Sequence, residues 1–117
     1  WNLLNKENGS QLVTGVTIVR SDFLKENEEA VKLFIEDHKA SAAYTSEHLD
    51  EAAEMVAALG IVEKAPIAKK AMPACNIVCI TGEEMKSALS GYLSVLEAAD
   101  AKSVGGQLPA DDFYYLP

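Results

Sequence analysis

The residues of this chain that could carry out chemistry are two cysteines, two histidines and an adjacent pair of aspartates. Cys75 and Cys79 lie four residues apart. If residues 74–80 form a strand, the two Cα atoms are about 13 Å apart, at roughly 3.3 Å per residue, which exceeds the limit of about 7 Å for a disulfide. We therefore expect two separate, buried thiols. A zinc site is not expected, because no other Cys or His pair has zinc-finger spacing.

The histidines and aspartates do not form a recognisable catalytic motif. His38 falls on the apolar face of a predicted helix and His48 lies near a helix start, and neither belongs to a Gly-x-Ser-x-Gly or Cys-His signature. Asp111 and Asp112 are neighbours without an EF-hand frame, so a solvated turn is expected there. The sequence therefore predicts no enzyme activity, no cofactor and no metal.

Two short segments have the composition of β-strands. Val16, Ile18 and Val19 lie within residues 12–20, and residues 74–80 contain three more β-branched side chains, which favour extended backbone. Helices are expected elsewhere. The predicted fold class is therefore α/β, helix-rich with a few short strands.

The helices are predicted from apolar spacing and from residues typical of helix ends. One spans about 28–45 after Asn27 as its cap, and a second runs from 46 or 50 to 59 and stops at Gly60. A short third helix contains Pro66 near its start and ends at Pro73. Thr81 and Glu84 have the spacing of a capping box, which predicts the start of a last helix. An aromatic tail, residues 111–115, is expected to dock on the surface.

Length and charge restrict the classes of function. A chain of 117 residues is long enough for one domain. Its 18 acidic and 10 basic side chains give a net charge of −8 without a basic block, which disfavours nucleic acid and anionic membrane surfaces. The sequence contains no run of about 18 apolar residues, so it predicts no membrane span. It also shows no leader in which basic residues precede an apolar segment. A small anion can still be captured by a helix N-terminus.

Three segments carry a resemblance to a known family: Leu12–Arg20 (LVTGVTIVR), Cys75–Lys86 (CNIVCITGEEMK) and Ser103–Tyr115 (SVGGQLPADDFYY). They resemble the C-terminal part of bacterial ABC-transporter solute-binding proteins, in the branch grouped with nitrate, sulfonate and thiamine-precursor binders. The resemblance implies a type II periplasmic-binding-protein architecture. Because such proteins are longer and two-lobed, it implies that residues 12–117 are a C-terminal portion. Residues 1–11 are then an N-terminal extension or a tag remnant.

The same resemblance implies an extracytoplasmic function. The chain would belong to the component that captures a small solute, an anion among the candidates, and delivers it to an ABC permease. The protein would be periplasmic or lipid-anchored, with its targeting signal upstream of Trp1.

The ligand-binding residues expected from this resemblance are Thr14, Gly15 and Asn76. Thr14 would offer a hydroxyl, Gly15 would allow close approach of a ligand, and Asn76 lies at the end of a predicted strand. A bulge or strand start at Gly15 and local turn bonding at Asn76 are the structural alternatives. The alternative function is a helix-rich protein-interaction or oligomerisation domain without a small-molecule ligand, forming homo-oligomers through an exposed face.

Overall fold

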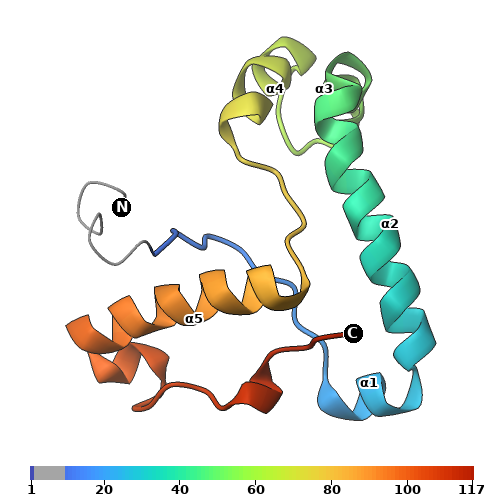
Figure 1. Ribbon diagram of the computed structural model, residues 1–117. Helices are drawn as coiled ribbons and strands as arrows, with labels where there is room; N and C mark the ends of the chain where they lie inside the picture. The colour runs from blue at the N-terminus through green and yellow to red at the C-terminus, as the bar shows by residue number, and fades with distance from the viewer. Residues whose placement is uncertain (2–9) are drawn as a thin grey trace. The chain divides into compact units, whose positions relative to one another are not determined.

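The structure, a computed structural model, describes Trp1 and residues 10–117, which divide into two compact units (Figure 1). The central unit is Arg20–Cys79, and the terminal unit combines Trp1–Val19 with Ile80–Pro117. Of the described residues, 65% are helical and none forms a strand. The prediction of an α/β fold with a few short strands was therefore wrong.

The two predicted strands are irregular segments for a physical reason. Residues 11–19 and 76–80 make no backbone–backbone hydrogen bonds within the described part of the chain. The start of the second segment is taken up by a 3₁₀ helix, η1 (Met72–Ala74), and Asn76 has a left-handed backbone with φ 50°. β-branched residues favour extended backbone, but a strand also needs a second segment to pair with its N–H and C=O groups. The local sequence does not reveal whether that segment is present.

The central unit consists of four α-helices followed by η1. These are α1 (Ser21–Glu26), α2 (Glu28–Glu47), α3 (Leu49–Ala58) and α4 (Ala65–Ala71). The predicted helices over 28–45 and 46 or 50 to 59 are confirmed. Asn27 occupies the N-cap position of α2 as predicted, but its side chain does not cap that helix and instead donates to the Phe23 carbonyl at 3.1 Å.

The end of α3 was predicted correctly from Gly60. This residue has φ 71°, its N–H donates to the Ala57 carbonyl at 3.0 Å, and the Ile61 N–H donates to the Val56 carbonyl at 3.1 Å. This pair of bonds is the Schellman arrangement, which satisfies carbonyls that the helix leaves without partners. The turn directs the chain into α4, which lies beside α3 (Figure 1).

The core of the central unit is small. Ala52 and Ala53 of α3 pack with Ala68 of α4 and with Met72, and four partly buried side chains surround them: Tyr44, Leu49, Val56 and Val62. Alanine side chains at the contact allow the two helices to approach closely. The small side chains also limit the apolar area that this contact buries.

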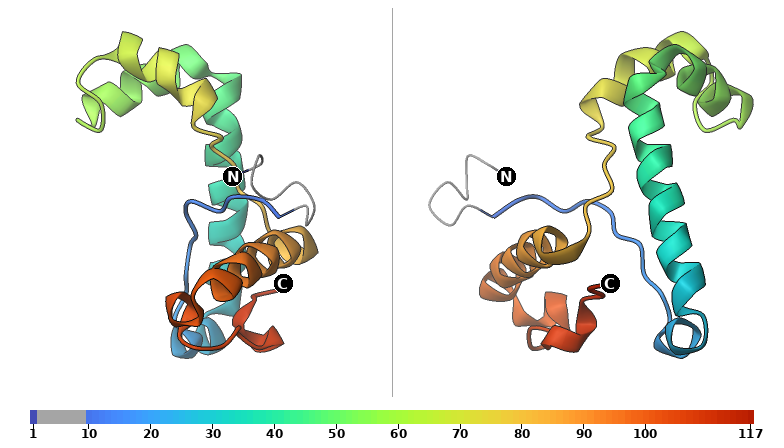
Figure 2. Two further views of the ribbon diagram at one scale, coloured as in Figure 1. Left: turned by 90° about the vertical axis from the view of Figure 1, so that its left-hand side faces the viewer. Right: turned by 45° about the vertical axis from the view of Figure 1, so that its right-hand side comes forward.

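The terminal unit contains α5 (Gly82–Ala99), η2 (Ala101–Val104) and η3 (Asp111–Phe113). After η2 the chain runs back along α5 (Figures 1 and 2). Thr81 is the N-cap residue of α5, so the predicted start is confirmed, but its side chain makes no capping hydrogen bond. Gly82, the first helical residue, has φ 66°. A capping box requires helical backbone through the first turn, and Gly82 departs from it.

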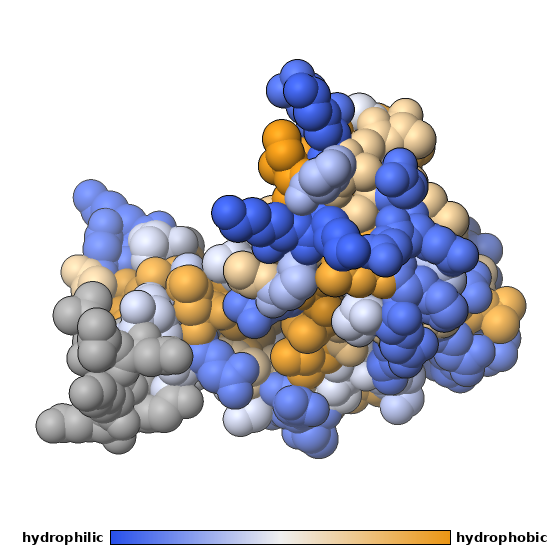
Figure 3. Space-filling model, turned by 90° about the horizontal axis from the view of Figure 1, so that it is seen from above, coloured by the Kyte–Doolittle hydropathy of each residue, from blue (hydrophilic) through white to orange (hydrophobic). Residues whose placement is uncertain are grey.

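Many large apolar side chains remain at the surface of both units. Apolar residues (orange) are interspersed among polar ones in the face shown by Figure 3. The buried apolar residues of the described part are Val31, Ala52, Ala53, Ala68, Met72 and Tyr114, whereas Ile18, Leu33, Leu59 and Ile61 are among the exposed ones.

Candidate functional site

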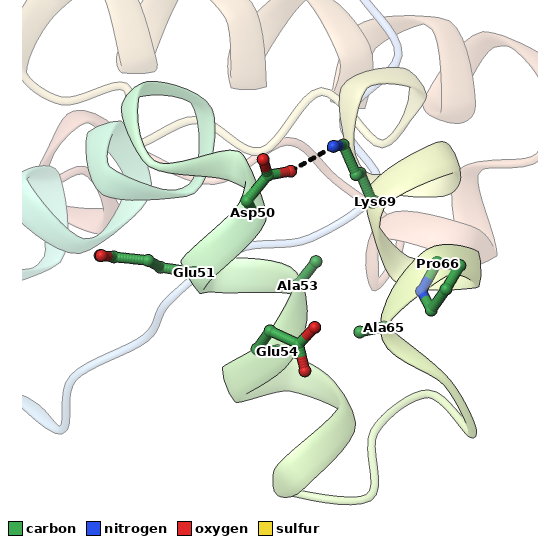
Figure 4. A pocket seen from close by; sticks show the side chains of 7 residues that line it. All are labelled: Asp50, Glu51, Ala53, Glu54, Ala65, Pro66 and Lys69. Atoms are coloured by element: carbon green, nitrogen blue, oxygen red, sulfur yellow. Dashed lines mark ion pairs between the residues drawn. The ribbon is translucent and has the colours of Figure 1, made fainter.

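The first candidate site is a hollow of about 430 Å³ between α3 and α4 in the central unit (Figure 4). Ala53 and Ala65 lie where the two helices face one another. Lys69 of α4 and Asp50 of α3 form an ion pair across the hollow, with Nζ and Oδ1 2.5 Å apart. The remaining lining residues are Glu51, Glu54 and Pro66.

The charges around this hollow are mostly negative, because Lys69 is the one cationic residue in a lining with three carboxylates. Glu51 extends from α3 away from α4 (Figure 4), where it accepts a hydrogen bond from the Tyr44 hydroxyl. That bond raises the pKa of Tyr44 above its usual 10.0. The Tyr44 ring stacks on His48, with ring centroids 4.4 Å apart and an interplanar angle of 20°.

These contacts join the end of α2 to α3. The Asp50–Lys69 pair is exposed to water, so its contribution to stability is small. Neither histidine of the central unit lines the hollow. The arrangement offers polar contact with a solute but does not place a nucleophile beside a base, which nucleophilic catalysis requires.

A second hollow, of about 440 Å³, lies on α5 in the terminal unit. Small side chains of α5 form most of its wall, and the Ser90 and Ser94 hydroxyls donate to carbonyls of their own helix, those of Ser87 and Ser90. Ser10 lies beside Gly91. This hollow is therefore where the N-terminal segment approaches α5, and two serine hydroxyls in its wall are already bonded.

The residues predicted to bind a ligand lie in different units. Thr14 and Gly15 belong to the terminal unit and Asn76 belongs to the central unit. All three are exposed, and none lines either of the two hollows. Their assignment to a ligand site stays a prediction.

The cysteines and aspartates give a mixed outcome. Cys75 and Cys79 are both free thiols, as predicted, but Cys75 is exposed and Cys79 half-buried, so the expectation of burial was wrong. Both lie after α4, on or next to residues 76–80, which make no backbone–backbone hydrogen bonds within the described residues. Asp111 is exposed as predicted, but it also pairs with Lys86, Nζ to Oδ1 2.9 Å.

Sequence reasoning did not find the contacts made by Glu51, Lys69 and Lys86. Tyr44 and His48 have helical i, i+4 spacing, which was a local signal for their contact. The Lys69–Asp50 and Lys86–Asp111 pairs join residues distant in sequence, and exposed charges carry no periodic signal for such partners.

Within the part of the chain that the structure describes, no helix is long and apolar enough to cross a membrane. No group of three or more His, Cys, Asp or Glu side chains is placed there to hold a metal ion. Comparisons with protein-family models, curated proteins and solved structures found no match to this chain.

Proposed function

We propose that the chain is the C-terminal portion of the solute-binding component of an ABC importer, which captures a small solute outside the cytoplasm for delivery to a permease. The proposal rests on the resemblance carried by Leu12–Arg20, Cys75–Lys86 and Ser103–Tyr115. It also rests on one structural observation, the exposure of apolar side chains on two segments that lack backbone partners.

That observation concerns residues 16–19 and 77–80. Val16, Ile18 and Val78 are 61%, 85% and 61% exposed, and these segments make no backbone–backbone hydrogen bonds in the described residues. Consecutive β-branched residues are typical of strands covered on both faces. Leaving them in water forfeits roughly 25 cal/mol for each Å² of apolar surface. A longer, two-lobed protein would supply the cover that these segments lack.

Solute binding would then depend on residues that the rest of the protein brings together. Thr14 and Gly15 precede the first apolar segment and Asn76 precedes the second, so covering those segments would fix the position of all three. The hydroxyl of Thr14 and the side-chain amide of Asn76 can both donate to an anionic solute.

The test is calorimetric titration of a polypeptide extended upstream of Trp1 beside the 117-residue chain. The probes are nitrate, an alkanesulfonate and a thiamine-precursor pyrimidine. The extended polypeptide should bind one of them, and the 117-residue chain should bind it at least about a hundredfold more weakly, because part of the binding cleft is missing. Sub-micromolar binding by the 117-residue chain, or no binding by the extended polypeptide, would contradict the proposal.

Variants of the extended polypeptide test the site separately. Thr14→Val and Asn76→Gly should each weaken binding by about tenfold or more, the loss expected for one hydrogen bond to a charged solute. Thr17→Val is the matched control, because Thr17 is a neighbouring exposed threonine. If binding occurs but Thr14→Val and Asn76→Gly leave it unchanged, the site assignment fails while the family assignment stands.

A second candidate function, an interaction domain that pairs with a second copy of this chain, is favoured by exposed apolar side chains on α1 and α2. Phe23, Leu33 and Phe34 are all exposed there. Sedimentation of the extended polypeptide distinguishes the candidates. A stable dimer that binds none of the probes would favour pairing, whereas a monomer that binds a probe would exclude pairing as the main function.

A further inference from the structure

The residues 107–117, here called the strap, contact the side chain of Lys86 of α5. Lys86 of α5 pairs with Asp111 at 2.9 Å, and its Nζ lies 5.8 Å from the centre of the Tyr114 ring. The backbone–backbone hydrogen bonds of the strap are local, from Phe113 to Ala110 and from Tyr114 to Asp111. Within the described residues, no backbone–backbone hydrogen bond joins the strap to α5.

The strap begins directly after two glycines with left-handed backbone. Gly105 has φ 81° and Gly106 has φ 96°. Their N–H groups donate to the Lys102 and Ala101 carbonyls, so both residues belong to the end of η2. The backbone of the next residues, Gln107 and Leu108, makes no backbone–backbone hydrogen bonds in the described part. Because glycine changes conformation at little steric cost, this junction can act as a hinge.

Most residues of the strap are exposed. Tyr114 is buried, with 8% of its surface exposed, but the neighbouring Asp111 and Phe113 are exposed. The Tyr115 hydroxyl is buried without a hydrogen-bond partner. A buried hydroxyl without a partner loses its bond to water and gains none in return, which favours a state in which it is solvated.

We propose that residues 107–117 are a movable strap that opens about Gly105–Gly106 and closes on α5 through Lys86. In the closed state, Lys86 holds Asp111 by charge and the Tyr114 ring by a cation–π contact. Both contacts involve a lysine near the surface, so salt weakens the attraction to Asp111. Opening exposes the ring of Tyr114, the one residue classed as buried in the described terminal unit.

Limited proteolysis with chymotrypsin, read by mass spectrometry at the bond after Tyr114, tests this device in the full 117-residue chain. Lys86→Gln should speed that cleavage roughly threefold to tenfold, since it removes both contacts. Lys86→Arg should restore the wild-type rate because arginine keeps the positive charge and can make the cation–π contact with Tyr114. Lys102→Gln, an exposed lysine on η2, is the charge-matched control and should leave the rate unchanged.

A salt series separates the anchor from a general loss of stability. Rates are normalised to a free peptide of residues 107–117. With this correction, 1 M NaCl should speed cleavage of the wild type but change the Lys86→Gln rate little. Equal cleavage rates for wild type and Lys86→Gln would overturn the proposal, as would equal acceleration by Lys86→Gln and Lys102→Gln.

The carboxyl of Asp111 gives a second readout. Its hydrogen bond to Lys86 holds the pKa of Asp111 below its usual 3.8. The same hydrogen bond raises the pKa of Lys86, and the nearby Glu83 and Tyr114 raise it further. The pair is therefore intact above 3.8 and is lost as pH falls through the lowered pKa. An NMR titration should show the Asp111 midpoint rising toward 3.8 in Lys86→Gln and staying in place in Lys102→Gln. An unchanged midpoint in Lys86→Gln would contradict the anchor.

Discussion

Asn76 is the one non-glycine residue with positive φ in the described part of the chain, at φ 50°. The left-handed region is crowded for a residue with a Cβ atom, and asparagine tolerates it better than most. Two factors can therefore account for asparagine at position 76: its left-handed backbone conformation and the solute contact proposed for its side-chain amide. A pair of substitutions separates them.

We expect Asn76→Ala to lower the free energy of unfolding by about 1 kcal/mol, because alanine is strained at this φ. Asn76→Gly should change it by less than about 0.5 kcal/mol, because glycine has no Cβ to clash. Urea denaturation of the 117-residue chain measures both. Equal losses for the two variants would mean that the side-chain amide, not the backbone, stabilises the turn.

At the residue scale, the sequence predicted which residues occupy the helix ends better than it predicted the hydrogen bonds that those residues make. Thr81 and Asn27 are N-cap residues as predicted, yet neither side chain makes the expected capping bond. The pattern of residue types is local, whereas the bond also depends on the backbone of the next residues, as the left-handed Gly82 illustrates. The free state of Cys75 and Cys79 was predicted, but their exposure depends on which segments cover them.

At the scale of elements, α5 contains two glycines in opposite conformations. Gly82 opens the helix with φ 66°, whereas Gly91 lies inside it with right-handed backbone. A Cβ at position 91 would lie 3.8 Å from the Ser10 Cβ, an ordinary van der Waals distance, and a Cβ at position 82 would contact nothing. Steric space therefore does not determine how either substitution to alanine affects stability; the backbone conformation at each position does.

We expect Gly91→Ala to raise the free energy of unfolding by roughly 0.5–1 kcal/mol, because alanine loses less entropy in a helix. Gly82→Ala should lower it by about 1 kcal/mol through left-handed strain. Thermal or urea unfolding of the two variants gives the comparison. Shifts of the same sign would show that α5 does not begin at Gly82 as described.

Helices were predictable from this sequence and strands were not, for one reason. A helix satisfies its backbone groups within its own residues, so the apolar spacing of 28–45 and the Gly60 stop were sufficient for α2 and α3. A strand satisfies its backbone through a partner that can lie anywhere in the protein. Val16–Val19 and Ile77–Ile80 have strand composition without such a partner in the described residues.

At the scale of the whole molecule, the two units bury few apolar side chains. The α3–α4 contact is built largely on alanines, and in the terminal unit the buried residue is Tyr114 of the strap. The central proposal is therefore that the apolar segments 16–19 and 77–80 are covered by other parts of a longer solute-binding protein.

Hydrogen–deuterium exchange of the amides in residues 16–19 and 77–80 tests this claim most directly. In the 117-residue chain these amides should exchange nearly as fast as in an unstructured peptide. In the polypeptide extended upstream of Trp1 they should exchange at least about a hundredfold more slowly, because the added cover shields them from water. The middle of α5 should be protected in both and is the internal reference. Fast exchange of both segments in the extended polypeptide, or strong protection in the 117-residue chain, would contradict the account.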